Sequence, residues 1–107
     1  MIFVSIRADI RPEKRDDWLA GIVRYSAQVR EEPGNIDFRC FESLEEPNRF
    51  AILASYADPD AGAAHVGSEH AGWFFGWLPS VVVEVPKIVY RELDGEGWAP
   101  MGEVVMD

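Results

Sequence analysis

Two histidines and a group of aromatic side chains are the residues here whose types suit chemistry on a small molecule. His65 carries an imidazole whose ordinary pKa, about 6.5, lies beside working pH, so it suits the role of proton acceptor. Tyr56 can orient a phenolic oxygen by hydrogen bonding, and the rings near residue 75 can stack on a planar molecule. The candidate catalytic residue is therefore His65, and the candidate substrate-binding residues are Tyr56, His70, Trp73, Phe74 and Trp77.

Each of these residues also has an ordinary structural interpretation. Trp73, Phe74 and Trp77 have the spacing of the buried face of a helix, so they can simply pack in a core. His65 can be a packed or surface histidine, and His70, in the first turn of an expected helix, can face solvent. The sequence leaves both interpretations open.

A metal site is not predicted. His65 and His70 are five residues apart, whereas two ligands on one helical face are typically four apart. The single cysteine, Cys40, excludes an internal disulfide and any multi-cysteine metal site. We expect Cys40 to be a small, buried, apolar residue.

The hydrophobic pattern predicts the elements that must position these side chains. Residues 2–10 alternate apolar and polar, which is typical of a half-buried strand. A helix is expected over about 13–31, a hairpin over 35–57 and a last strand over about 87–93. A second helical region begins at Asp58-Pro59-Asp60 and breaks near Gly67-Ser68, where Ser68 can cap the next helix.

The element order β-α-β-β-α-β predicts an α+β, ferredoxin-like fold, a four-stranded antiparallel sheet with both helices on one face. The other face of the sheet carries many apolar residues, among them Phe3, Phe41 and Val89. A face this apolar predicts a homodimer packed sheet to sheet. Arg7 shares that face, so a catalytic role for Arg7 needs a bulge or a route through the partner; pairing with an acidic neighbour is the alternative.

Composition limits the function classes. A chain of 107 residues makes one domain, expected over 1–93, with a glycine-rich tail over 94–107. The net charge of −9 argues against nucleic acid and anionic membranes as partners. No targeting segment and no stretch of about 20 apolar residues is present, so a cytoplasmic location is expected.

Several short motifs, in this order, resemble one known family. They are Arg11-Pro12-Glu13-Lys14, Glu32-Pro33-Gly34, Glu46-Pro47-Asn48-Arg49-Phe50 leading to Tyr56-Ala57-Asp58, Ala64-His65-x-x-Ser68-x-His70, and Pro86-Lys87-Ile88-Val89-Tyr90. Together they are similar to the antibiotic biosynthesis monooxygenase-like domains of the dimeric α/β-barrel superfamily.

The resemblance implies a homodimer with a ligand cavity between each sheet and its helices. It also implies oxidation of quinols or aromatic polyketides by O2 without metal, haem or flavin. We therefore expect a cofactor-independent monooxygenase with no cofactor, acting on a small aromatic substrate. Such a reaction needs a base near neutral pKa, a donor or cation for the enolate, and a dry aromatic pocket. His65 is the expected base, and Arg7 is the expected enolate partner.

The sequence departs from the family pattern at the end of the third strand. Many relatives carry a glutamate there, whereas this chain has Ala54-Ser55-Tyr56. This favours, as the alternative, a non-catalytic small-molecule-binding dimer of the same fold. A structural dimer with no cavity and a haem oxygenase are two further alternatives. The resemblance implies that the haem enzymes use an asparagine on the first strand and a ligand histidine late in the second helical region. In this chain Arg7 and Phe75 lie near those two positions.

Overall fold

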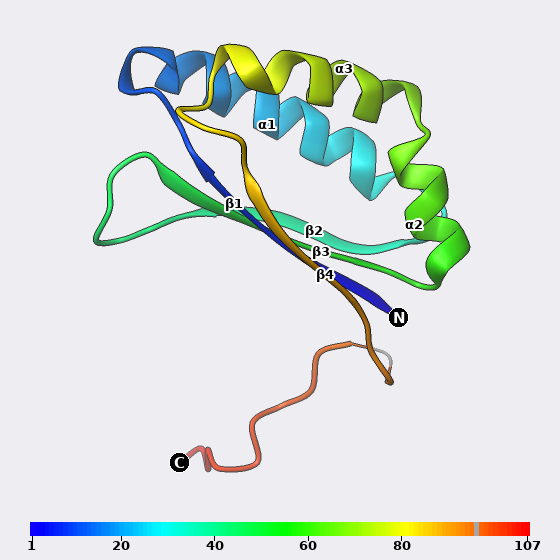
Figure 1. The fold of residues 1–107 in the computed structure, drawn as a ribbon. Coiled ribbons are helices and arrows are strands. Elements are labelled where there is room, and N and C mark those ends of the chain that lie inside the picture. Colours follow the sequence, from blue (N-terminus) through cyan, green and yellow to red (C-terminus); the bar gives the residue numbers. More distant parts are fainter. Residues whose placement is uncertain (96) are drawn as a thin grey trace.

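The structure is a computed structural model that describes residues 1–95 and 97–107, and it consists of one antiparallel sheet with helices on one face (Figure 1). The strands lie in the order β2-β3-β1-β4. The strands are Ile2–Asp9 (β1), Asn35–Glu42 (β2), Arg49–Tyr56 (β3) and Lys87–Glu92 (β4). The helices are Arg15–Arg30 (α1), Pro59–Val66 (α2) and Glu69–Trp77 (α3), with 3-10 turns at Pro12–Lys14 and Leu78–Ser80. The ferredoxin-like α+β prediction is confirmed.

Helix α1 follows a 3-10 turn that starts at Pro12, where a missing N–H costs nothing. Asp16 and Asp17 lie in its first turn, next to the positive end of the helix dipole. Its inner face buries Trp18, Ile22, Tyr25, Ser26 and Val29. The helix was predicted from the sequence, whereas the place of Tyr25 on its buried face, over the sheet, was not.

Helices α2 and α3 are separated by a sharp turn at Gly67 and Ser68. The Ser68 hydroxyl accepts a hydrogen bond from the Ala71 N–H at 3.2 Å, as an N-cap, and donates to the His65 carbonyl at 2.6 Å. Helix α3 lies beside α1, whereas α2 descends at one end of the sheet (Figure 1). The histidines at 65 and 70 therefore project from two differently oriented helices.

The register of β1 is unbroken on both sides. Its pairs with β3 run from Ile2↔Tyr56 to Asp9↔Arg49 without a shift, and those with β4 from Ile2↔Glu92 to Arg7↔Lys87. Alternate residues of β1 therefore keep to one face throughout. The one register shift in the sheet's described residues lies in β2, between Asn35 and Asp37.

The core beneath the helices is centred on Trp18, which is fully buried. Its ring lies 5.5 Å from that of Phe50, edge to face, and 6.1 Å from that of Trp77, stacked. Gly21 permits this stacking, because a Cβ built at Gly21 would lie 2.3 Å from the end of the Trp77 ring. Trp77 is thereby committed to packing against α1.

Residues 97–107 extend away from the sheet (Figure 1). They carry exposed apolar side chains, including Trp98, Val105 and Met106. Within the part of the chain that the structure describes, no helix has the length and apolar character needed to cross a membrane.

Replacing the central tryptophan tests this account of the core. Trp18→Ala is expected to lower the free energy of unfolding by about 3–5 kcal/mol, because it removes a fully buried ring and leaves a cavity. Urea denaturation measures the loss. Trp98→Ala is the matched control, since that ring is 72% exposed and its removal should change stability by less than about 0.5 kcal/mol. Equal effects of the two substitutions would contradict a core centred on Trp18.

Candidate functional site

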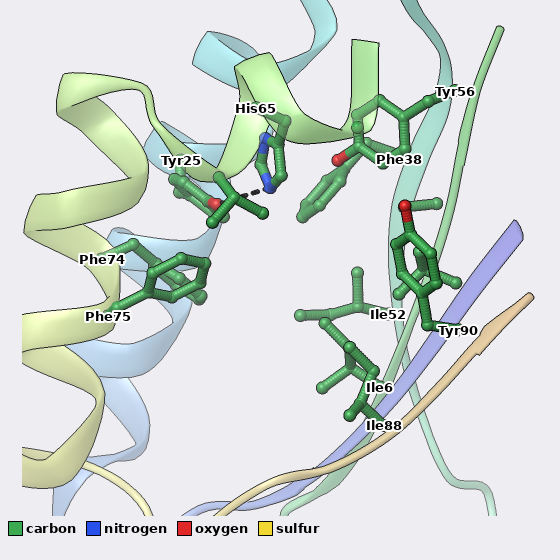
Figure 2. Close-up of a pocket in the computed structure, with 14 residues that line it drawn as sticks. Ile6, Tyr25, Phe38, Ile52, Tyr56, His65, Phe74, Phe75, Ile88 and Tyr90 are labelled. Atoms are coloured by element: carbon green, nitrogen blue, oxygen red, sulfur yellow. Dashed lines mark hydrogen bonds between the residues drawn. The ribbon is translucent and has the colours of Figure 1, made fainter. Parts of the chain in front are cut away.

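A cavity of about 110 Å³ lies between the sheet and the helices (Figure 2). Its walls are aliphatic and aromatic, with one imidazole and three phenolic hydroxyls as the polar side-chain groups. The lining residues are Val4, Ile6, Tyr25, Phe38, Ile52, Ala54, Tyr56, Gly62, His65, Val66, Phe74, Phe75, Ile88 and Tyr90. Such a hollow suits a small, mainly apolar ligand with one or two polar groups.

Strand alternation explains which residues form the floor. Every second residue of β1, β3 and β4 points toward the helices, so the floor is aliphatic in its middle. Ile88 and Tyr90 on the edge strand β4 line the cavity and remain 60% and 45% exposed, so the cavity opens toward that edge. The Tyr90 hydroxyl reaches α2, where a Cβ built at Gly62 would lie 3.0 Å from it. The glycine therefore leaves room for Tyr90 to close part of the entrance.

His65 is buried at one end of the cavity, and both of its ring nitrogens have partners. Nδ1 lies 2.9 Å from a carboxylate oxygen of Glu32, and Nε2 lies 3.2 Å from the Tyr25 hydroxyl (Figure 2). A carboxylate can only accept, so the network assigns the imidazole proton to Nδ1. Nε2 then accepts the Tyr25 O–H and holds its lone pair toward the cavity. This is the tautomer that a proton acceptor for a bound ligand needs.

Two tyrosines beside His65 are neutral donors. Burial raises the pKa of Tyr25 and of Tyr56 well above the usual value, and the Glu32 carboxylate adds to both shifts. The Tyr25 ring stacks on Phe74 with a centroid separation of 3.8 Å, which fixes its position. The Tyr56 ring lies 5.1 Å from the imidazole of His65. Both hydroxyls can therefore donate to an oxygen of a ligand.

Glu32 links the two histidines. Besides His65, its carboxylate contacts Nε2 of His70 at 2.5 Å, and its side chain is only 14% exposed. Glu32, which lies in the turn after α1, was not predicted as a site residue. The five-residue spacing of His65 and His70 predicted that they do not act together on one helical face. The turn at Gly67 and Ser68 overrides that spacing, because it puts them on two helices whose rings converge on one carboxylate.

The cluster of Glu32, His65 and His70 has donor atoms within 4.8 Å of one another. Two imidazoles and a carboxylate are a donor set that divalent transition metals accept in general. Here each imidazole nitrogen that faces Glu32 forms a hydrogen bond with it, so the three groups satisfy one another as a continuous chain.

Arg7 lies on the far side of the sheet from the cavity. Because the β1 register has no bulge, Arg7 shares the open face and lies in a shallow hollow with Phe41, Glu42 and Arg49. The bulge that a catalytic role would need within one chain is therefore absent from β1, and only the route through a partner subunit stays open as a prediction.

The acidic neighbours of Arg7 are engaged by other arginines. Arg49 binds Asp9 at 2.7 Å and lowers the pKa of that carboxyl, and Arg15 pairs with Glu42. The Arg15 guanidinium and the backbone N–H of Asn48 lower the pKa of Glu42 to about 2. Arg7 forms no ion pair within 4.0 Å among residues 1–95 and 97–107, so the sequence alternative of a cross-strand pair is not met.

The aromatic residues predicted to contact substrate divide into two groups. Phe74 and Tyr56 line the cavity, whereas Trp73 and Trp77 do not. The two tryptophans stack on each other at 5.3 Å, and Trp77 packs on the core while Arg24 covers Trp73. Helical spacing correctly grouped these rings, but it could not specify which of them faces the hollow.

Other lining residues and one predicted contact differ from expectation. His70 is absent from the cavity lining and is linked to His65 through Glu32. Tyr25 and Phe75 line the cavity without having been singled out; Tyr25 was detectable as a polar residue on the buried stripe of α1. Cys40 is partly buried, and burial raises the pKa of its thiol to about 11, consistent with a non-nucleophilic, apolar role.

Comparison with known proteins decides the family. The antibiotic biosynthesis monooxygenase family model matches residues 1–76, which include Glu32, His65 and His70. The chain belongs to the antibiotic biosynthesis monooxygenase family. It is 30% identical over 70 residues to "Putative monooxygenase YcnE" of Bacillus subtilis (strain 168), covering 65% of this chain and 74% of that protein.

Solved structures agree with the family's fold. A crystal structure of an antibiotic biosynthesis monooxygenase superposes with a TM-score of 0.81 at 20% identity, over 89% of this chain and all of that chain. Rv0793 from Mycobacterium tuberculosis gives a TM-score of 0.83 at 18% identity, over 91% of this chain and 98% of that one. These similarities establish the ferredoxin-like architecture, while the chemistry must be argued from the cavity.

Filling the cavity tests whether it is the binding site of this family member. Phenol is expected to bind there and to shift the NMR signals of lining residues. Ala54→Leu, which projects a larger side chain into the hollow, should weaken phenol binding at least about tenfold, or ~1.4 kcal/mol. Ala51→Leu is the matched control, because Ala51 lies on the same strand in the hollow of the opposite face. Unchanged binding in Ala54→Leu would place the phenol elsewhere.

Proposed function

We propose that the protein is a cofactor-independent monooxygenase that oxidises a small phenol or hydroquinone with O2. One observation carries this proposal: a single imidazole, held by Glu32 with its Nε2 lone pair toward the interior, forms part of an otherwise aliphatic and aromatic cavity. The family supports an oxygenase, and the substrate class comes from the cavity.

The first step is removal of the phenolic proton. A phenol in the cavity donates its O–H to Nε2 of His65, taking the place of the Tyr25 hydroxyl, and the proton passes to the imidazole. Tyr25 is then free to donate to the phenolate oxygen, and Tyr56 offers a second donor nearby. These neutral hydroxyls supply the stabilisation that the sequence analysis assigned to Arg7.

The second step is oxygen transfer, and the substrate supplies its electrons. The phenolate gives one electron to O2, and the resulting superoxide and phenoxyl radical join at a ring carbon that carries hydrogen, para or ortho to the oxygen. The peroxide takes up a proton from His65 and loses water: its O–O bond breaks, one oxygen stays as a carbonyl and the other leaves as H2O with the ring hydrogen. Phenol plus O2 thus gives quinone plus water, a hydroquinone gives a hydroxyquinone plus water, and no external reductant is needed.

The cavity dimensions limit the substrate. A dry cavity of about 150 Å³ is known to accept one benzene ring, and this hollow has a volume of about 110 Å³ and opens toward β4. A single ring is therefore the largest aromatic group that the hollow can take, and its substituents would point toward the opening at Ile88 and Tyr90. The departure at Ala54 agrees with this arrangement, because Ala54 contributes space while Glu32 supplies the carboxylate from the other side of the site.

Oxygen uptake tests the proposal. The protein is mixed with a panel of single-ring hydroquinones, with and without a chelator, and O2 consumption is followed with an electrode. Uptake should be insensitive to chelator and should fall about 100-fold or more in His65→Gln, since general bases contribute that much. With isotopically labelled O2, one label should appear in the quinone and one in water.

The controls separate the alternatives. Glu31→Gln removes an exposed carboxylate next in sequence to Glu32 and should leave uptake unchanged. Tight hydroquinone binding without O2 uptake would instead support the non-catalytic binding dimer. A Soret shift on addition of haem, with haem turnover, would support haem oxygenation.

We also propose that the active form is a homodimer. The open face of the sheet exposes Phe41 and Val89 by 52% each, with Phe3 and Leu53 half-buried beside them. A second copy of the same sheet is the occupant that fits, because an antiparallel face can pack on itself about a twofold axis and bury these side chains.

Sedimentation tests the dimer. The wild-type chain should sediment as a dimer at micromolar concentration, and Val89→Asp should sediment as a monomer, because a carboxylate would be buried between the sheets. Val23→Asp is the control: Val23 is 68% exposed on α1, outside the proposed interface, so this variant should stay dimeric. A monomeric wild type would contradict the proposal.

A further inference from the structure

We propose that Glu32 and His70 form a proton path that connects His65 in the cavity with solvent at a second, outer hollow. The path deepens the proposed function, since it rests on His65 receiving a proton from the bound phenol. It makes Glu32 and His70 positioning and relay residues that do not contact the substrate.

The path is a continuous series of hydrogen bonds. The Tyr25 hydroxyl lies 3.2 Å from His65 Nε2, His65 Nδ1 lies 2.9 Å from Glu32, and Glu32 lies 2.5 Å from His70 Nε2. Each separation is within the range across which a proton moves without large displacement of the heavy atoms. The carboxylate uses the same oxygen, Oε2, in its shortest contacts with both imidazoles.

The two ends of the path face different surroundings. His65 lines the apolar cavity, whereas His70 lines an outer hollow of about 410 Å³ between α1 and α3. The outer hollow is bounded by Arg24, Gln28, Glu69, His70 and Trp73, so water is well accommodated there. A proton that leaves His70 therefore reaches solvent without crossing the cavity.

The path serves both halves of the reaction. His65 takes up a proton when the phenolate forms and must supply one when water leaves, because phenol plus O2 gives quinone plus water with no net release of protons. Glu32 and His70 let a proton leave after the first event and return before the second, and Tyr25 and Tyr56 cannot replace them, because neutral phenolic groups are poor proton acceptors. Glu32 is the one carboxylate within hydrogen-bond distance of His65 among the described residues.

The proton count balances. The Glu32 carboxylate can only accept, so its contacts assign one proton to Nδ1 of His65 and one to Nε2 of His70, and the path requires a second proton on Nδ1 of His70. A proton enters at His65 Nε2, the Nδ1 proton passes to Glu32, and a proton leaves from Nδ1 of His70 to water, so the net charge of the chain of groups is unchanged. The same transfers in reverse, when His65 gives up its Nε2 proton for the departing water, restore the starting tautomer.

Other titratable groups surround the path. On the cavity side, Tyr25 of α1 and Tyr56 of β3 face His65. On the outer side, Arg24 of α1 and Glu69 of α3 line the hollow beside His70. Arg24 and Glu69 have opposite charges, so neither positive nor negative charge dominates the outer hollow beside His70.

The test uses 4-nitrophenol, whose colour reports its own ionisation. The protein with bound 4-nitrophenol is subjected to a rapid pH jump in weak buffer, and the rate at which the bound phenol reaches its new ionisation state is measured. His70→Gln should slow this rate at least about tenfold, leave the affinity for 4-nitrophenol unchanged, and regain speed when imidazole is added. Glu32→Gln should slow it as well, whereas Glu31→Gln, which removes an exposed carboxylate outside the outer hollow, should not.

A second measurement needs no ligand. Exchange of the His65 Nδ1 proton with solvent, followed by NMR, should be at least about tenfold slower in His70→Gln than in the wild type. Equal rates in both measurements would overturn the path, as would a wild-type rate that changes on chelation, because a metal would then occupy the cluster. Neither measurement uses O2, so slowed exchange without O2 uptake would retain the path and reject the monooxygenase.

Discussion

The contact of the Glu32 carboxylate with two imidazoles is the interaction on which the site depends. A carboxylate with only 14% of its side chain exposed is costly unless its oxygens are hydrogen-bonded. Among residues 1–95 and 97–107, the donors to its side chain come from α2 and α3, so satisfying Glu32 requires both helices to be in place at once. The same bond fixes which nitrogen of His65 carries the proton. The buried Glu32 carboxylate therefore links α2 to α3 and also orients His65 with Nε2 free to accept a proton.

The strand alternation gives this small sheet two separate tasks. Residues of β1, β3 and β4 that face the helices form the aliphatic floor of the cavity, and their neighbours form the opposite, open face. Since the period is two and the β1 register has no bulge, no residue of β1 can serve both faces. That is why Arg7 is separated from His65 even though both were natural candidates for one site. It is also why, in the proposed mechanism, the donors to the phenolate come from α1 and β3, as Tyr25 and Tyr56.

How much of this the sequence could predict depends on the range of the interaction. Periodicity identified β1, α1, the hairpin and the capping role of Ser68, because these are set by neighbours a few residues away. The choice of Phe74 over Trp77 for the cavity depends on rotation of α3 about its axis, which is fixed by the space above Gly21 on another helix. Glu32 was invisible for the same reason: its partners lie 33 and 38 residues further along the chain. Local sequence patterns predict which face of a helix or strand a residue lies on, whereas its partner on another element depends on tertiary packing.

The hydrogen bond between Tyr25 and His65 also bears on which ligands can bind at the His65 end of the cavity. In the structure the Tyr25 hydroxyl uses the lone pair that a base must offer to substrate, so a ligand gains access only by replacing that donor. A purely apolar molecule cannot make the exchange and leaves the pair intact, whereas a phenol restores the lost hydrogen bond and frees Tyr25 to donate to its oxygen. Replacing one bond by two costs little and rewards only ligands with a hydroxyl at the right end. The contact between Tyr25 and His65, which exists before any substrate arrives, thus supports the proposed selection for phenols over equally shaped hydrocarbons.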